Sequence, residues 1–402
     1  MEQFLASRLD AVKVSPSSAA KARVDSLRAA GRQIVNFTIG EPDFPTPRHI
    51  VEAGIAALND GQTRYTGAGG TPALRQAIVA KLKRDNDLSY KDTEVVVGNG
   101  AKQIIFCALT ATLNAGDEVI IPTPYWVSYP DMVALNDGRP VIVSTRPETG
   151  FKLTPAQLEE AITDRTRWLV LNTPSNPTGA IYTSDELLAL AQVLREHPNV
   201  WLLTDEIYEH FSYGTVRHVS PLTVAPDLAS RTLIVNGVSK SHAMTGWRIG
   251  YGAAPRVLVA AIELLLSQST SCASSISQAA AVTALDGPQD CVADAVALFD
   301  ARRRRMVELL NAVPGLSCGL PDGAFYVFVS VAGLIGKTTP SGQRLDSDVD
   351  VMMYFLDTAG VATIDGSSYG QPNYLRMSFA TSIEQIEVGC RALASVVAEL
   401  KN

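Results

Sequence analysis

The segment Ser239-Lys240-Ser241-His242-Ala243-Met244-Thr245-Gly246-Trp247-Arg248 lies between two short apolar runs, Thr232 to Val235 and Arg248 to Tyr251. Each run has the length of a buried strand, so we expect the decapeptide to connect two strands. The amine of Lys240 can hold a carbonyl cofactor, such as pyridoxal phosphate, as a Schiff base, and Arg248 can bind its phosphate. Taken alone, the same spacing also fits two basic residues on a solvated loop.

Further apolar runs of similar length precede this segment: Glu94 to Val97, Glu118 to Ile121, Arg167 to Leu171 and Val200 to Leu203. Helix start signals at Thr71-Pro72, Thr154 and Ser184 lie between runs or before the first. The alternation predicts an α/β domain with a mostly parallel central sheet flanked by helices.

The alternation ends near Leu285. A long helical stretch follows, and then two strand-like runs, Phe325 to Val329 and Leu375 to Phe379. We therefore expect a smaller α+β domain in the C-terminal part. A helix is expected from about Ser17 to Ala30, but the pattern alone does not assign the N-terminal segment to either domain.

The composition limits the classes of function. The chain has 402 residues, of which 19% are charged, and a net charge of -7, so it offers no broad cationic surface for nucleic acid or anionic lipid. The cluster Arg302-Arg303-Arg304-Arg305 is expected to be a solvated helix face. Small-molecule chemistry fits better than binding to nucleic acid or to a membrane.

The cysteine and histidine patterns bear on the cellular compartment and on metal binding. The five cysteines are odd in number and form no CxxC pair, which indicates reduced thiols in a cytosolic protein. No apolar run approaches the roughly 18 residues of a membrane span, and the first residues lack the apolar core of a signal peptide. The five histidines form no HExxH or other ligand spacing, so no metal site is predicted. The predicted location is the cytoplasm.

Polar residues follow the ends of the predicted strands, where open α/β sheets bind ligands. Gly98-Asn99-Gly100-Ala101-Lys102 opens into a helix whose N-terminal N–H groups can hold a phosphate, although a plain strand-to-helix turn also fits. Asp205 follows a buried run and needs a cationic partner, which a protonated pyridine nitrogen or an ordinary salt bridge would supply. Tyr208 can donate a hydrogen bond to the phenolic oxygen of the same ring.

Three more residues complete the candidate site. Asn176 lies in a turn with two X-Pro bonds that are candidates for cis geometry, and its amide can reach the phenolic oxygen. Trp126 can stack on a flat ring, although a core position fits equally well. Arg376 lies within a strand-like alternation, where a bidentate contact to a substrate carboxylate or a structural ion pair would explain it.

Together these residues resemble the fold type I pyridoxal-phosphate-dependent aminotransferases of class I, in their bacterial aspartate aminotransferase-like branch. The resemblance spans nearly the whole chain and is carried by eight ordered motifs: Gly40-Glu41-Pro42-Asp43-Phe44, Arg64-Tyr65-Thr66, Asn99 to Gln103, Pro124 to Tyr129, Asn172 to Gly179, Asp205 to Glu209, Ser239 to Arg248, and Arg376. It implies a large cofactor-binding domain over 46–287 and a small domain built from both termini, 1–45 and 288–402.

The resemblance also implies roles for single residues. Lys240 would form the internal aldimine and shuttle the proton, Asp205 would pair with the pyridine nitrogen, and Asn176 and Tyr208 would hold the phenolic oxygen. Trp126 would stack on the ring, and Arg376 would bind the substrate α-carboxylate near Gly40. Gly100, Ala101, Lys102, Ser239 and Arg248 would lie at or near the phosphate. Tyr65 would reach the phosphate in a neighbouring subunit, which implies a homodimer with shared active sites.

The implied reaction moves an amino group from an L-amino acid to 2-oxoglutarate by a ping-pong mechanism, with aspartate as the leading donor. Lys102 stands where this branch often recognises the distal carboxylate of the substrate. Three departures bear on these implications: Gly237 replaces a common serine, Pro16-Ser17-Ser18-Ala19 lacks a final hydroxyl, and Ile364-Asp365-Gly366 replaces Val-Pro-Gly near the expected substrate entrance.

Other functions stay open. They include aminotransferases for prephenate/glutamate, aromatic or basic amino acids, and a β-lyase or decarboxylating condensing enzyme on the same fold. A cofactor-sensing regulator would be expected to carry a DNA-binding domain or to have lost Lys240, and neither is seen in the sequence.

Overall fold

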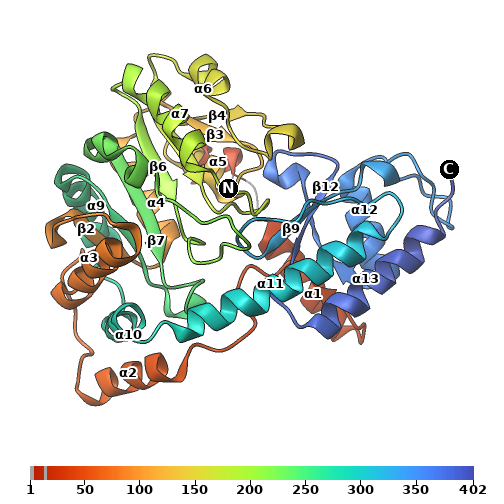
Figure 1. Ribbon diagram of the computed structural model, residues 1–402, viewed down its shortest axis with the longest axis horizontal. Coiled ribbons are helices and arrows are strands. Elements are labelled where there is room, and N and C mark those ends of the chain that lie inside the picture. Colours follow the sequence, from red (N-terminus) through yellow and green to blue (C-terminus); the bar gives the residue numbers. More distant parts are fainter. Residues whose placement is uncertain (1–3, 13–15) are drawn as a thin grey trace.

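The computed structural model describes residues 4–12 and 16–402. Its centre is a seven-stranded sheet of order β2-β8-β7-β6-β5-β3-β4 (Figure 1). β8 runs antiparallel to both of its neighbours, and the other adjacent pairs are parallel. The strands are β2 (Val95–Gly98), β3 (Glu118–Pro122), β4 (Arg139–Val143), β5 (Thr166–Asn172), β6 (Trp201–Asp205), β7 (Thr232–Gly237) and β8 (Gly250–Ala253). The predicted mostly parallel sheet is confirmed.

Two details of the strand prediction were wrong. β4 was missed, although Val141 to Val143 is an apolar run as long as that of β3; the structure places this strand at the edge of the sheet, where it is only partly buried. The last strand of the sheet begins at Gly250 rather than at Arg248, whose backbone is left-handed at φ 58°. Arg248 therefore ends the preceding loop.

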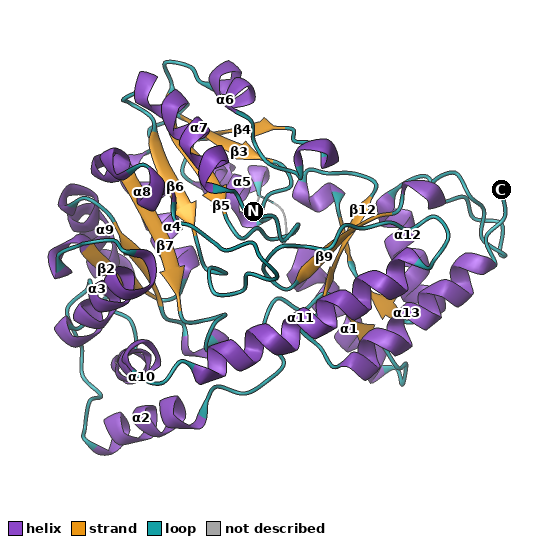
Figure 2. Ribbon diagram, viewed as in Figure 1, coloured by secondary structure: helices purple, strands orange, loops and turns teal. Residues whose placement is uncertain are grey.

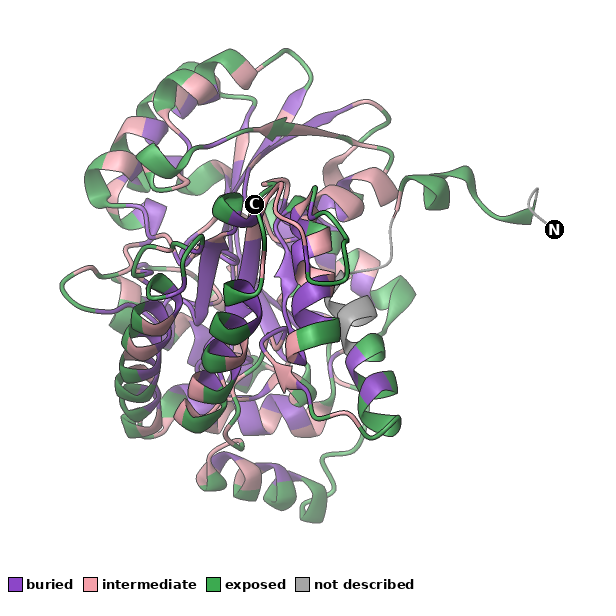
Figure 3. Ribbon diagram, turned by 90° about the vertical axis from the view of Figure 1, so that its right-hand side faces the viewer, coloured by how far each residue is buried: buried purple, intermediate pink, exposed green. Residues whose placement is uncertain are grey.

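Helices cover both faces of this sheet (Figure 2). They are α3 (Pro72–Asn86), α4 (Ala101–Thr112), α5 (Ser128–Leu135), α6 (Pro155–Ala161), α7 (Ser184–Glu196), α8 (Pro221–Val224), α9 (Arg256–Ser269) and α10 (Ser275–Asp286), and α2 (Arg48–Asn59) packs on the outside of α10. Thr71 and Thr154 cap α3 and α6 as predicted, while α7 is capped by Thr183, one residue before the predicted start signal. Figure 3 shows the buried strands between helices whose outer faces are exposed.

A second layer follows the long helix α11 (Asp290–Asn311), which runs from the large sheet to a three-stranded antiparallel sheet of order β11-β12-β9 (Figure 1). Its strands are β9 (Tyr326–Ser330), β11 (Ile364–Asp365) and β12 (Tyr374–Ser378), accompanied by α12 (Asp348–Tyr354) and α13 (Ile383–Ala398). Both strands predicted in this part are present, which confirms the smaller α+β unit.

The N-terminal segment divides between the two parts of the molecule. The short helix Ser7–Ala11 lies against α5 of the large domain, where Arg8 pairs with Asp137 at 3.9 Å. The segment from Pro16 onward lies with the C-terminal layer. The N-terminal helix α1 (Pro16–Ala29) leads to β1 (Val35–Asn36), which pairs in parallel with β10 (Val361–Ala362). This pairing favours a small domain built from both termini. The boundaries at 45/46 and 287/288 stay predictions.

The arginine cluster on α11 is not uniformly solvated. Arg302 and Arg303 are 7% and 3% exposed, whereas Arg304 lies on the exposed side. Arg302 binds both oxygens of Asp43 at 2.7 and 3.0 Å, and Arg303 pairs with Asp300. The predicted solvated face was wrong for these two residues, because consecutive residues point about 100° apart around a helix and two of the four must face the protein.

All five cysteines lie in the described part of the chain and are free thiols. Within residues 4–12 and 16–402, no helix combines the length and the apolar character that a membrane crossing requires. The cytoplasmic location stays a prediction.

Candidate active site

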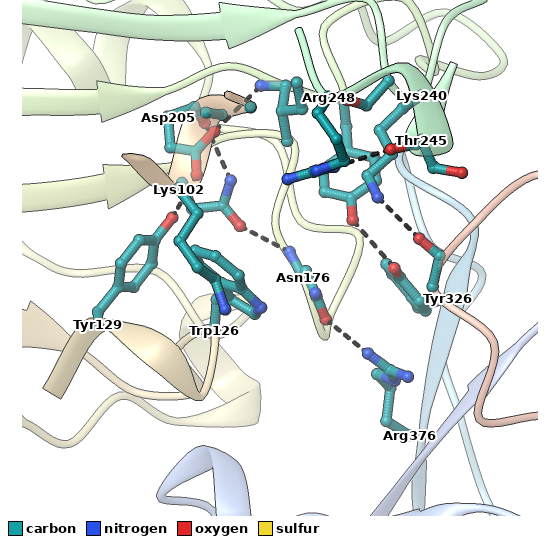
Figure 4. A pocket seen from close by; sticks show the side chains of 17 residues that line it. Lys102, Trp126, Tyr129, Asn176, Asp205, Lys240, Thr245, Arg248, Tyr326 and Arg376 are labelled. Atoms are coloured by element: carbon teal, nitrogen blue, oxygen red, sulfur yellow. Dashed lines mark hydrogen bonds between the residues drawn. The ribbon is translucent and has the colours of Figure 1, made fainter. Parts of the chain in front are cut away.

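A cavity of about 240 Å³ lies at the carboxyl ends of β5, β6 and β7 and is lined from the small sheet by β9 and β12 (Figure 4). Except for Tyr65, every predicted site residue lines it: Gly40, Gly100, Ala101, Lys102, Trp126, Asn176, Asp205, Tyr208, Ser239, Lys240, Arg248 and Arg376. Tyr65 is 90% exposed and lies elsewhere on the surface. The structure thus brings residues from distant parts of the sequence to one place, as expected at this edge of a sheet.

Lys240 lies three residues beyond the end of β7. Its Nζ donates a hydrogen bond to the carbonyl oxygen of Gly40 at 2.8 Å (Figure 4). Burial lowers the pKa of Lys240 to about 8, and the charge of Arg248 acts in the same direction, while Glu41 and Asp205 act against it. A lower pKa gives this amine a larger unprotonated fraction near neutral pH, as a nucleophilic lysine requires.

Asp205 ends β6 and is 4% exposed. Its carboxylate accepts hydrogen bonds from the Tyr129 hydroxyl at 2.7 Å and from the Ile207 amide at 3.2 Å. Burial raises the pKa of Asp205 to about 6, and the Tyr129 hydrogen bond acts against the rise. Because both donors are neutral, the cavity can still stabilise a positively charged group of a ligand beside this carboxylate.

Helix α4 points its N-terminus into the cavity. Gly100 precedes it with φ 90°, and a Cβ on Gly100 would lie 2.4 Å from Nη2 of Arg248, so only glycine fits this cradle. Arg248 is held by the carbonyl oxygens of Thr245 at 2.8 Å and Asn99 at 3.2 Å. Free backbone N–H groups beside a guanidinium are the donor set that a phosphate prefers, so these residues fit a phosphate-bearing cofactor.

Lys102, on the first turn of α4, lies over the ring of Trp126 at 4.7 Å and donates to Ser128 Oγ at 3.0 Å. Burial lowers the pKa of Lys102, and the nearby charge of Arg248 lowers it further. The cavity therefore holds four basic side chains (Lys102, Lys240, Arg248 and Arg376) against the single carboxylate of Asp205. This excess of positive charge favours anionic ligands.

Arg376, on β12, is 2% exposed. Its Nη1 donates to Asn176 Oδ1 at 3.3 Å, and its Nη2 donates to the carbonyl oxygen of Thr38 at 2.6 Å. Its guanidinium lies 4.5 Å from the ring centroid of Tyr326 and 5.5 Å from that of Tyr369. No carboxylate hydrogen-bonds to Arg376 among the described residues, so the structural ion pair considered in the sequence analysis is not the reason for this arginine.

The turn that carries Asn176 is rigidly tied to β6. Asn172 donates through Nδ2 to the carbonyl oxygen of Asp205 and accepts from the Asn176 amide at 2.8 Å. Both X-Pro bonds in this turn, Thr173-Pro174 and Asn176-Pro177, are cis, as considered from the sequence.

Five residues that line the cavity were not predicted as site residues: Tyr129, Asn172, Ile207, Thr245 and Tyr326. Tyr129 follows Trp126 by three residues, a spacing of about one helical turn that could have indicated a shared face. No sequence signal connects Tyr326 with the site, because its partners are distant in the chain. Asp365 accepts hydrogen bonds from Ser368 and does not line the cavity, and its place near the substrate entrance stays a prediction.

A second buried charge cluster lies four residues beyond Asp205. Glu209 pairs with Lys81, whose side chain is 1% exposed, and also accepts from Asn236 Nδ2 at 2.9 Å. Glu209 and Glu206 lie with His218 in the spacing of metal ligands, and the sequence had predicted no metal site. Glu206 accepts from Ser220 at 2.8 Å, so protein donors already serve both carboxylates.

The chain was compared with known proteins. The family model for class I and II aminotransferases matches residues 32–393. The chain belongs to this family. Its sequence is 50% identical over 390 residues to a probable aspartate/prephenate aminotransferase of Rhizobium leguminosarum bv. phaseoli, covering 97% of this chain and 98% of the relative.

Solved structures agree with this assignment. The aspartate aminotransferase of Rhizobium meliloti is similar with a TM-score of 0.96 and 47% identity, covering 99% of each chain. The aspartate aminotransferase of Thermus thermophilus with maleate has a TM-score of 0.91 and 40% identity, covering 98% of this chain and 99% of that one. The aminotransferase family, the fold type I architecture and the dependence on pyridoxal phosphate, which the sequence motifs implied, are thus confirmed.

Proposed function

We propose that this aminotransferase moves the amino group of L-aspartate to 2-oxoglutarate in two half-reactions, with pyridoxal phosphate bound at Lys240. The observation that carries the proposal is the pair of cations Lys102 and Arg376 in one cavity with Lys240. A substrate with two carboxylates can engage both cations, which a substrate with a neutral side chain cannot.

Different residues of the cavity would bind the cofactor, bind the substrate and transfer the proton. When bound, pyridoxal phosphate supplies a carbonyl that reacts with amines and a ring that withdraws electrons. The N-terminus of α4 and Arg248 would hold its phosphate, Trp126 would cover its ring, and Asp205 would hold the proton on the ring nitrogen. Arg376 orients the α-carboxylate of the substrate. Lys240 Nζ would take the proton from the substrate Cα and hold it for return, which requires the free amine that burial favours.

The reaction class is tested by Lys240→Ala in the purified holoenzyme. We expect transamination between aspartate and 2-oxoglutarate to fall by at least about 10⁴-fold, since the variant loses both the covalent link and the proton carrier. The visible absorbance of the cofactor bound to lysine is lost as well. A variant that keeps full activity would exclude Lys240 from these roles.

The amino donor is tested with Lys102→Ala and a panel of donors. We expect kcat/KM for aspartate to fall about tenfold to a hundredfold, the range for a lost ionic contact, while alanine and phenylalanine are little affected. Equal losses for all donors would contradict a distal-carboxylate role for Lys102. The names of the relatives also include prephenate, so prephenate with glutamate is included as a second acceptor and donor pair.

We propose further that the enzyme is a homodimer with shared active sites, supported by the exposed side chain of Tyr65 outside its own cavity. Sedimentation should give twice the 43.0 kDa of one chain. A Tyr65→Phe variant should bind pyridoxal phosphate more weakly, by about three- to tenfold for one lost hydrogen bond. A monomer of full activity would contradict both parts of the proposal.

A further inference from the structure

Tyr326 connects two parts of the cavity. It lies on β9, where Phe328 is the direct partner of Arg376 on β12, so Tyr326 and Arg376 are diagonal neighbours on the same face of the small sheet. The guanidinium carbon of Arg376 is 4.5 Å from the centre of the Tyr326 ring. The ring of Tyr326 therefore interacts electrostatically with the guanidinium of Arg376, the group proposed to bind the substrate carboxylate.

The hydroxyl of Tyr326 faces the other way, toward the cofactor side of the cavity (Figure 4). It lies 2.9 Å from the Tyr208 hydroxyl, and a Cβ on Gly40 would lie 3.4 Å from it. Tyr326 and Tyr208 are both almost completely buried, at 1% and 4% exposure. Their hydrogen bond is therefore shielded from competing water.

The direction of this hydrogen bond follows from the proton count. Each hydroxyl has one proton to donate and an oxygen that can accept. If Tyr208 donates its proton to the phenolic oxygen of the cofactor, its own oxygen is left to accept from Tyr326. The positive charge of Arg376 makes the Tyr326 hydroxyl a stronger donor, and a stronger donation to Tyr208 in turn strengthens Tyr208 as a donor.

We propose that Tyr326 is a positioning residue that transmits carboxylate binding at Arg376, through Tyr208, to the proton on Lys240 Nζ. This proposal rests on the proposed function, because it requires pyridoxal phosphate at Lys240. A substrate carboxylate neutralises Arg376 and weakens the donation from Tyr326 to Tyr208. The phenolic oxygen then keeps more negative charge and holds the proton on Lys240 Nζ more firmly.

Other groups also act on this proton. The charged groups facing Lys240 are Glu41, Arg248, Asp205 and Arg376. A parallel route from Arg376 runs through the hydrogen bond to Asn176. The substitution Tyr326→Phe leaves all of these groups in place, keeps the ring against Arg376 and removes only the hydroxyl.

The test is a pH titration of the visible absorbance of the holoenzyme, with and without saturating maleate, a dicarboxylate that cannot react. In the wild type we expect maleate to raise the midpoint of the titration. In Tyr326→Phe we expect the midpoint without maleate to rise by about 0.5 pH unit, and the further rise on adding maleate to shrink by a similar amount, since one of two routes is lost. Steady-state rates should show a lower kcat with less than about a threefold change in KM, because Arg376 is intact.

The matched control is Tyr354→Phe. This residue is also buried in the core of the small layer, and its hydroxyl donates to the carbonyl oxygen of Val396 at 3.0 Å, away from the cavity. Its removal should leave both midpoints unchanged. A double-mutant cycle with Tyr208→Phe adds a second criterion: in the Tyr208→Phe background, Tyr326→Phe should shift the midpoint no further.

The outcomes are distinct. A Tyr326→Phe titration identical to that of the wild type, or full additivity with Tyr208→Phe, overturns the coupling while leaving the aminotransferase function intact. A wild-type protein that binds pyridoxal phosphate without a link to Lys240, or that does not transaminate, overturns the proposed function instead.

Discussion

Asp205 and Glu209 are two buried carboxylates four residues apart, and the protein treats them in opposite ways. Asp205 receives hydrogen bonds from neutral donors, and burial raises its pKa to about 6. Glu209 is paired with Lys81, whose charge overcomes the effect of burial and holds the pKa of Glu209 well below its usual range. The protein itself supplies the cation that pairs with Glu209, which is Lys81. At Asp205 no described residue makes such a pair, so a positively charged group of a ligand can take that place.

The largest effect on stability is expected from breaking the ion pair of Lys81 with Glu209. Lys81→Met should reduce the free energy of unfolding by about 3–5 kcal/mol, because Glu209 would remain as an unpaired buried charge. Urea denaturation of the holoenzyme measures this loss. The control is Lys83→Met, which breaks the exposed pair of Lys83 with Asp87 and should change the free energy of unfolding far less, because solvent screens this pair. Equal losses in the two variants would contradict the contrast.

Removing the negative charge of Asp205 should impair catalysis rather than destabilise the protein. We expect Asp205→Asn to lower kcat by about 10² to 10³-fold, the range for losing one group that stabilises developing charge. Its affinity for pyridoxal phosphate should fall too, and titrating the cofactor-free protein through its tryptophan fluorescence measures this. Wild-type kcat in Asp205→Asn would mean that this carboxylate pairs with no ligand charge.

The pH dependence of stability sharpens the comparison. The pKa of Asp205 is raised on folding, so in the cofactor-free protein its contribution to stability is lost as pH rises from about 4 to about 6. Asp205→Asn should therefore stabilise the cofactor-free protein by about 3 kcal/mol at pH 8 and by much less at pH 4. Glu209 acts with the opposite sign, since a lowered pKa contributes stability that is lost only as pH falls below its usual value. Thermal denaturation of the wild type and of Asp205→Asn from pH 4 to pH 8 measures the contribution of Asp205. An equally large gain of stability by Asp205→Asn at pH 4 would contradict the raised pKa, because the Asp205 carboxyl is already protonated in the folded protein at that pH.

The sequence was informative where local pattern and chemistry coincide. Strands β2, β3, β5, β6 and β7 were predicted because each contains a short continuous apolar run, and the residues that follow these runs indicated the cavity. The edge strand β4 was missed although Val141 to Val143 is a run of the same kind, and the structure shows it only partly buried. The burial of Arg302 depends on Asp43, 259 residues away, so the local pattern could not reveal it.

The same limit explains the missed site residues. Lys240 and Arg248 have an amine and a guanidinium that can serve a Schiff base and a phosphate, and the polar residues after the other strands supplied matching groups, so the sequence connected them with the site. Tyr326 looks like any aromatic residue of a buried strand. Its importance depends on two contacts, to Arg376 and to Tyr208, that exist only once the two sheets are placed side by side.

The surplus of basic side chains in the cavity has a practical consequence for preparing the enzyme. Lys102, Lys240, Arg248 and Arg376 repel one another when no anion is present, so the cofactor-free protein should take up phosphate or sulfate from its buffer. Such ions would occupy the N-terminus of α4 and slow reconstitution with pyridoxal phosphate. Purification in a buffer of large organic cations and chloride, rather than in phosphate, should give a cofactor-free protein that reloads faster.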